Sequence, residues 1–162
     1  TGFLATPFLL DVLMDLGENA LAETVLWQSR RPGWLYETDH GATTIWEHWD
    51  GIMENGEFWS TDMNSFNHYA YGSVADWIYE QAAGIRVVEE HPGFEKAWIQ
   101  PKPGDQLEWL GASIETRHGK ISSRWTHTDG AIRYEIVTPV PAQIVIGEKE
   151  YTVEPGNYIF WE

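Results

Sequence analysis

The spacing of apolar residues changes once along the chain, from a helical period in the first half to an alternating period in the second. Thr6-Pro7 is typical of a helix start and Gly17 of a helix end. Between them apolar residues repeat at helical spacing, at Phe8, Leu9, Val12, Leu13 and Leu16. Asn19 is typical of a second helix cap, and it precedes a shared apolar face at Leu21, Val25 and Leu26. The pattern predicts two short antiparallel helices with a tight link.

Residues 34–67 show neither period and are rich in Gly, Trp, Asp and Asn. They predict long loops that flank a short ordered segment near residues 43–49, and long loops in a compact domain are usually functional. A helical stripe then returns and stops at Gly84. The stripe consists of Val74, Trp77, Ile78 and Ala82.

Strand and turn signals dominate after Gly84. Within residues 131–137, Ile132, Tyr134 and Ile136 alternate with polar residues, as in a half-buried antiparallel strand. Further strands are predicted at Ala97–Ile99, Val140–Ile146, Tyr151–Val153 and Tyr158–Trp161, and turn signals such as Asp129-Gly130 separate them. The regular spacing predicts a small antiparallel β-sandwich of the Greek-key type. We therefore expect a mixed α and β fold whose two parts meet near residue 90.

Composition excludes several classes of protein. Ten Lys plus Arg against 25 Asp plus Glu give a formal net charge of −15, which repels phosphodiesters and anionic lipid headgroups. We expect no nucleic acid partner and no membrane partner, since no run approaches the roughly 20 apolar residues of a membrane span. There is no cysteine and no zinc-like histidine spacing, so we expect no metal and no cofactor. Because the chain begins at Thr1, we interpret it as a fragment.

Two clusters carry the candidate chemistry. In residues 43–51, Glu47 lies between Trp46 and Trp49, and a carboxylate walled by aromatic rings suits proton transfer near neutral pH. The alternative is a surface carboxylate beside two core tryptophans. In residues 64–72, amide, imidazole and phenol groups precede a predicted helix and can hydrogen-bond sugar hydroxyls. The alternative there is a helix-entry loop whose polar groups are satisfied internally.

Three motifs follow one another in a characteristic order and spacing, at Thr1 to Pro7, at Ala42 to Gly51 and at Ser65 to Gly72. Together they resemble the end of the catalytic domain of glycoside hydrolase family 78, the bacterial α-L-rhamnosidases. The stretch from Ala83 to Pro101 and the later strands resemble that family's terminal β-domain. The resemblance implies that residues 1–90 are the last helices of an (α/α)6 barrel and residues 91–162 a C-terminal β-sandwich.

The resemblance also implies a chemistry. The family inverts an α-L-rhamnosyl bond with a general acid and a general base, both carboxylates. By motif, Glu47 corresponds to the base and His68 to a residue that contacts bound rhamnose. Trp46, a pocket neighbour, and Asn67 are expected to bind substrate as well. In inverting enzymes the two carboxyl groups lie roughly 6.5–9.5 Å apart. We expect the acid in an upstream part of the same enzyme, before Thr1, so that this chain is inactive alone.

Two other functions stay open. Another (α/α)6 glycosidase or phosphorylase, of the trehalose or maltose phosphorylase-like group, has similar barrel ends, although Glu47 in its tryptophan context together with Asn67 and His68 favours a rhamnosidase. A carbohydrate-binding β-sandwich without catalysis would expose Trp109 or Trp125 on a sandwich face, and burial of both would count against it. The sequence leaves the compartment, bacterial cytoplasm or periplasm, and the aglycone open.

Overall fold

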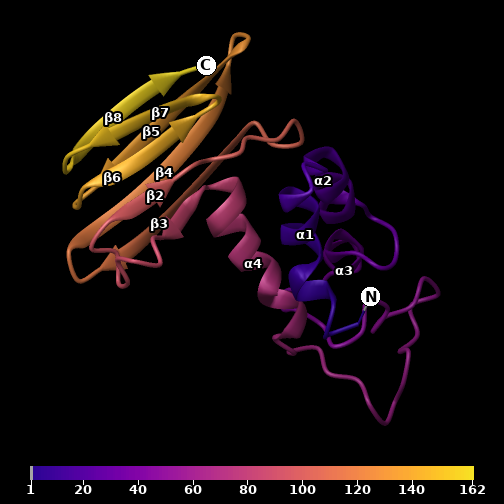
Figure 1. Cartoon of the computed structure of the whole chain (residues 1–162). Helices are drawn as coiled ribbons and strands as arrows, with labels where there is room; N and C mark the ends of the chain where they lie inside the picture. The colour runs from indigo at the N-terminus through magenta and orange to yellow at the C-terminus, as the bar shows by residue number, and fades with distance from the viewer. Residues whose placement is uncertain (1) are drawn as a thin grey trace. The chain divides into compact units, whose positions relative to one another are not determined.

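The computed structural model describes residues 2–162, so Thr1, the first residue of the N-terminal motif, lies outside the described residues. The chain divides into two compact units, one up to residue 75 and one from residue 76 to residue 162. Helices and loops form the first unit and two four-stranded sheets most of the second (Figure 1). The expected mixed α and β class is confirmed. Division into independently folding domains at 1–90 and 91–162 stays a prediction.

Three helices belong to the first unit: α1 (Thr6–Asp15), α2 (Asn19–Trp27) and α3 (Trp34–Asp39). The first two are the predicted helices. Ala5 rather than Thr6 takes the cap position of α1, and the Thr6 hydroxyl donates to the Gly2 carbonyl at 3.0 Å. Gly17, with φ +78, ends α1 in a left-handed conformation that glycine adopts without strain.

The buried residues of α1 lie outside the apolar stripe noted in the sequence. Leu10 and Met14 are buried, whereas Phe8, Val12 and Leu16 are 66%, 50% and 71% exposed. The helical spacing read from the sequence is confirmed, and α1 is apolar on more than the face that it buries. A helix that is apolar on two faces is typical of a helix packed on both sides in a larger protein.

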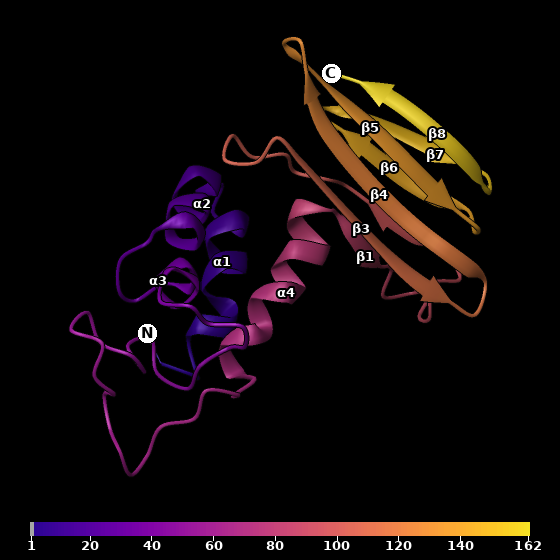
Figure 2. The ribbon, with the colours of Figure 1, turned by 180° about the vertical axis from the view of Figure 1, so that it is seen from behind.

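The region between α3 and the next helical turn is irregular, as predicted, and it runs as a long open loop (Figure 2). The short ordered segment expected near residues 43–49 contains no helix or strand, and hydrogen bonds to residues 65–68 hold it in place. The regular element is α3, which at six residues is too short to display a period in the sequence.

A continuous helical stretch follows, with the turn types changing along it: η1 (Ala70–Ser73), α4 (Val74–Trp77) and η2 (Ile78–Ala82), a π-helical turn. Trp77 and Ala82 are buried, as the predicted stripe requires, and Val74 and Ile78 are half-buried. Gly84, with φ +75, ends the stretch. A Cβ atom at Gly84 would overlap the backbone of Gln100, so this position requires glycine.

The second unit contains two sheets, which Figure 1 and Figure 2 show from opposite sides. One has the order β1-β2-β6-β7, formed by Ile85–Val87, Ala97–Ile99, Ala142–Ile146 and Lys149–Val153. The other has the order β3-β4-β5-β8, formed by Trp109–Thr116, Gly119–Thr128, Ala131–Thr138 and Gly156–Trp161. All neighbours pair antiparallel except β2 and β6, which are parallel.

The two sheets share one core, as a sandwich requires. Ile99 and Ile144 from one sheet and Trp125, Tyr134 and Ile136 from the other are buried in a single cluster. The predicted alternation in β5 is confirmed, because Ile132, Tyr134 and Ile136 pack in or against this cluster, while the polar residues between them are not buried. The β-sandwich therefore folds around its own core.

Candidate functional site

The two motif segments of the first unit lie side by side, joined by hydrogen bonds. The Glu47 N–H donates to the Ser65 carbonyl at 2.8 Å, and the Ser65 N–H returns a bond to Glu47 Oε2 at 3.0 Å. The His68 N–H donates to the Ile45 carbonyl at 2.8 Å, and the Thr44 hydroxyl donates to the Phe66 carbonyl. Segments about twenty residues apart in sequence are thus aligned, and the Glu47 carboxylate has a fixed orientation.

Glu47 and Trp49 are half-buried, and Trp46 is buried. Trp46 is 3% exposed, and its ring meets Phe66 edge-on at 5.3 Å between centroids. Trp49 stacks on Tyr71 at 3.8 Å between centroids. The two tryptophan rings therefore pack against other aromatic rings, while Glu47 remains partly exposed. That combination suits a base that takes a proton from a water molecule.

His68 and Asn67 lie at the other end of the same pair of segments. The His68 ring stacks on Phe3 at 4.9 Å between centroids, and its Nδ1 accepts the Ala70 N–H at 3.4 Å. Because Nδ1 is an acceptor, the neutral imidazole carries its proton on Nε2 and can donate there to a hydroxyl group. Asn67 is exposed, and its N–H donates to the Ser65 hydroxyl oxygen at 3.3 Å.

Glu37, in α3, is a buried carboxyl group that the sequence analysis missed. The residue is 2% exposed, and its Oε2 accepts a hydrogen bond from the backbone N–H of Trp46 at 3.1 Å. Its Oε1 is buried and has no hydrogen-bond partner among the described residues. Burial raises the pKa of Glu37 to about 7, although the Trp46 N–H acts in the opposite direction. The sequence signal was Trp34 one helical turn earlier, which places Glu37 on the same buried face.

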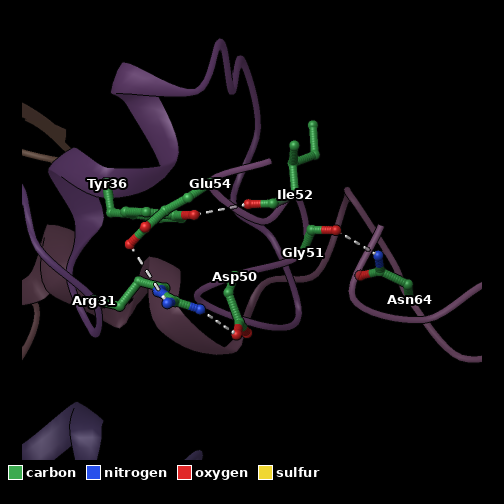
Figure 3. A network of polar contacts seen from close by, with 7 residues as sticks. All are labelled: Arg31, Tyr36, Asp50, Gly51, Ile52, Glu54 and Asn64. Carbon is green, nitrogen blue, oxygen red and sulfur yellow. Dashed lines mark hydrogen bonds and ion pairs between the residues drawn. The ribbon is translucent and has the colours of Figure 1, made fainter. Parts of the chain in front are cut away.

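The loop after Glu47 is anchored by a polar network (Figure 3). The Arg31 guanidinium bonds Asp50 at 2.9 Å and Glu54 at 3.5 Å. The Tyr36 hydroxyl donates to the Ile52 carbonyl at 3.0 Å. The Asn64 amide donates to the Gly51 carbonyl at 2.9 Å, which joins this loop to the start of the second motif. These contacts limit the motion of the chain that leaves Glu47.

A cavity of about 420 Å³ opens beside this network in the same unit. It contains none of the four predicted site residues, and its lining carries both signs of charge. Its lining residues are Ser29, Arg30, Arg31, Tyr36, Asp39, His40 and Glu54. Within residues 2–162, no three metal-ligating side chains gather, and no helix is long and apolar enough to cross a membrane.

Of the two tryptophans whose exposure would favour a carbohydrate-binding module, one is buried and the other is exposed. Trp125 is 1% exposed, and its indole N–H donates to the Ala82 carbonyl at 2.9 Å. Trp109 is 52% exposed, with the Arg124 guanidinium 4.2 Å from its ring centroid. Trp161, on β8, is 57% exposed as well. The outer face of the β3-β4-β5-β8 sheet therefore presents two indoles in one register row.

Comparison with known families gives one match for each part of the chain. Residues 1–82 match the bacterial alpha-L-rhamnosidase six-hairpin glycosidase domain. Residues 84–157 match the bacterial alpha-L-rhamnosidase C-terminal domain. The two matches agree with the resemblance drawn from the motifs.

Individual relatives carry the same name. The chain is 45% identical to an alpha-L-rhamnosidase of Streptomyces avermitilis over 130 residues, which are 80% of this chain and 12% of the relative. It is 39% identical to an alpha-L-rhamnosidase of an Alteromonas species over 139 residues, 86% of this chain and 15% of the relative. The chain thus spans less than a sixth of these relatives.

Solved structures extend the similarity to the fold. The S. avermitilis alpha-L-rhamnosidase complexed with L-rhamnose aligns with a TM-score of 0.90 at 35% identity, over 100% of this chain and 18% of that one. The native enzyme from Aspergillus terreus aligns with a TM-score of 0.93 at 32% identity, over 99% of this chain and 19% of that one.

Proposed function

The chain belongs to the bacterial α-L-rhamnosidase family, and we propose that it is part of an inverting glycoside hydrolase that removes terminal α-L-rhamnose from glycans or glycosides. The observation that carries the proposal is the hydrogen-bonded pair of segments that brings Glu47 and His68 together. The similar S. avermitilis structure holds L-rhamnose, which supports the choice of sugar.

In the proposed mechanism Glu47 is the general base. Its carboxylate takes a proton from a water molecule while the water oxygen forms a bond to the anomeric carbon. The bond from that carbon to the leaving oxygen breaks, and a general acid gives this oxygen a proton. Because water attacks opposite the leaving group, the product has inverted configuration. The Ser65 N–H on Glu47 Oε2 orients the base.

His68 and Asn67 bind the sugar in this proposal. The N–H at His68 Nε2 donates to a rhamnose hydroxyl, and the exposed Asn67 amide offers both a donor and an acceptor. Trp46 lies beside the proposed sugar pocket. Its ring is buried, and its backbone N–H donates to Glu37, so it fixes the position of the chain next to Glu47. Neither role requires a cofactor.

We further propose that the general acid lies in a part of the enzyme outside these residues and that the chain is inactive alone. Two observations support this. The relatives are several times longer than the segment that matches, and α1 together with its C-cap residue exposes an apolar stripe at Phe8, Val12 and Leu16. In a six-hairpin domain, neighbouring helices cover such a stripe.

A second candidate concerns the sandwich alone. Exposed Trp109 and Trp161 on one sheet face favour carbohydrate binding there, since flat indoles suit sugar rings. The Arg124 guanidinium over Trp109 counts against it, and only one of the two tryptophans named from the sequence is exposed. The other (α/α)6 glycosidases and phosphorylases are not favoured, because both parts of the chain match rhamnosidase families.

The test is hydrolysis of p-nitrophenyl α-L-rhamnopyranoside by the complete enzyme and by residues 1–162 in parallel, with proton NMR of the first product. We expect β-L-rhamnose from the complete enzyme and no turnover by the chain alone. Turnover by the chain would place both carboxylates within it. A complete enzyme that is inert towards rhamnosides, or that releases α-L-rhamnose first, would overturn the proposal.

A further inference from the structure

We propose that Glu37 is a positioning residue for the general base: it holds the Trp46 N–H from the interior and so sets the orientation of the adjacent Glu47. This inference rests on the proposed function of Glu47. Glu37 is 2% exposed and therefore does not contact substrate. It acts through the backbone that carries the base.

The geometry of α3 supports this role. Trp34 and Glu37 lie one turn apart on its buried face. The Trp34 indole N–H donates to the Tyr71 carbonyl at 2.8 Å, and Glu37 Oε2 accepts the Trp46 N–H at 3.1 Å. One helix face thus holds both motif segments, the one with the base and the one that leads from His68 into the next helix.

The loop from α3 to the base is fixed at both ends by the same residue. The Glu37 carbonyl accepts the N–H groups of His40 at 3.1 Å and Ala42 at 3.0 Å, which ends the helix. The Glu37 side chain then reaches the N–H of Trp46, the residue before the base. Without the side-chain bond, the buried backbone N–H of Trp46 would have no acceptor. Because an unpaired buried N–H is costly, the chain around Trp46 would shift to pair it elsewhere.

Glu37 supplies a hydrogen-bond acceptor for the backbone N–H of Trp46, at the distance that its side-chain length sets. A neutral carboxyl group can accept this bond as well as a carboxylate can. Burial raises its pKa to about 7, and Oε1 has no partner among the described residues. A glutamine has the same length and keeps an acceptor oxygen. An aspartate keeps the carboxyl group but is one methylene too short, and a methionine keeps the length but loses the acceptor.

The experiment compares Glu37→Gln, Glu37→Asp and Glu37→Met in the complete enzyme. Turnover is normalised to the concentration of L-rhamnose binding sites, so that loss of folded protein does not count as loss of catalysis. We expect Gln to keep turnover close to the parent. We expect Asp and Met to lower kcat by about 10-fold to 100-fold with little change in KM, because a displaced base affects the transition state more than binding.

A matched control is Leu26→Ala, at a buried residue of α2 whose side chain has no polar atom with which to hold a motif segment. It should lower the unfolding temperature and leave kcat per binding site unchanged. If Met does not fold, the Asp and Gln pair decides. Parental kcat in Asp, or a kcat in Gln as low as in Asp, would overturn the inference. A parent inert towards rhamnosides would instead overturn the proposed function.

Discussion

At the scale of the residue, the site depends on backbone groups more than on side chains. Glu47 and His68 were identified by motif. Hydrogen bonds of backbone N–H groups hold their two segments together, and no sequence pattern predicts these bonds. Glu37 was missed because a carboxylate in a helix is normally exposed. Only the buried Trp34 one turn earlier marks it as an exception.

Glu37 gives a prediction about stability and pH. The pKa of Glu37 is about 7 in the folded chain, against 4.5 for an unperturbed glutamate. Between these values the folded state binds more protons than the unfolded state, so the free energy of unfolding falls as the pH rises from about 4.5 to about 7. The full loss is on the order of 3 kcal/mol at most, since each unit corresponds to about 1.4 kcal/mol.

Urea unfolding of residues 1–162 at pH 5 and at pH 8 measures this dependence, with Glu37→Gln as the comparison. The parent should lose more stability across this interval than the variant, which cannot ionise at that position. The net charge of −15 affects both proteins nearly alike, so the difference isolates Glu37. Equal losses in the two proteins would contradict the assignment.

At the scale of the element, strands bounded by turn signals were predictable, even the three-residue β2, whereas α3 and the pairing of the strands were not. Alternation marked β5 in the sequence, and turn signals marked most of the other strands. The six-residue α3 is too short to show a helical period in the sequence. The parallel pairing of β2 with β6 joins segments far apart in the chain, so no local sequence pattern predicts it. The buried side of α1 was unpredictable because both sides are apolar.

Gly84 gives a prediction at this scale. Gly84→Ala forces a side chain into a left-handed conformation and into the backbone of Gln100, so we expect a loss of more than about 3 kcal/mol in the free energy of unfolding. Gly130→Ala is the matched control, since its φ is also positive, at +83, but nothing lies near the added carbon. There we expect a loss of about 1–2 kcal/mol. Denaturant unfolding measures both, and similar losses would show that the close approach at Gly84 is unimportant.

At the scale of the whole molecule, the chain combines a sandwich with its own core and a helical unit with an uncovered apolar stripe. The family matches explain this difference, because one part corresponds to a C-terminal domain and the other to a portion of a six-hairpin domain. We therefore expect the β-sandwich of the isolated chain to fold, while the apolar stripe of α1 lacks a packing partner.

The uncovered stripe predicts self-association of the isolated chain. Phe8→Lys combined with Val12→Glu places charges on the stripe and should shift the chain towards monomer in sedimentation velocity at the same concentration. Ile159→Glu, at an exposed position of β8, is the control and should have little effect. A parent that is monomeric at every concentration, or an equal response to the control, would contradict the role of this stripe.

The central claim is that Glu47 is the general base, and the most direct test is Glu47→Gln in the complete enzyme, with rhamnoside turnover and L-rhamnose affinity measured on the same preparation. Glutamine keeps the size and one acceptor oxygen for the Ser65 N–H, but it cannot take a proton from water. The account predicts turnover at least about 10²-fold lower with rhamnose affinity unchanged. Turnover equal to that of the parent would contradict it.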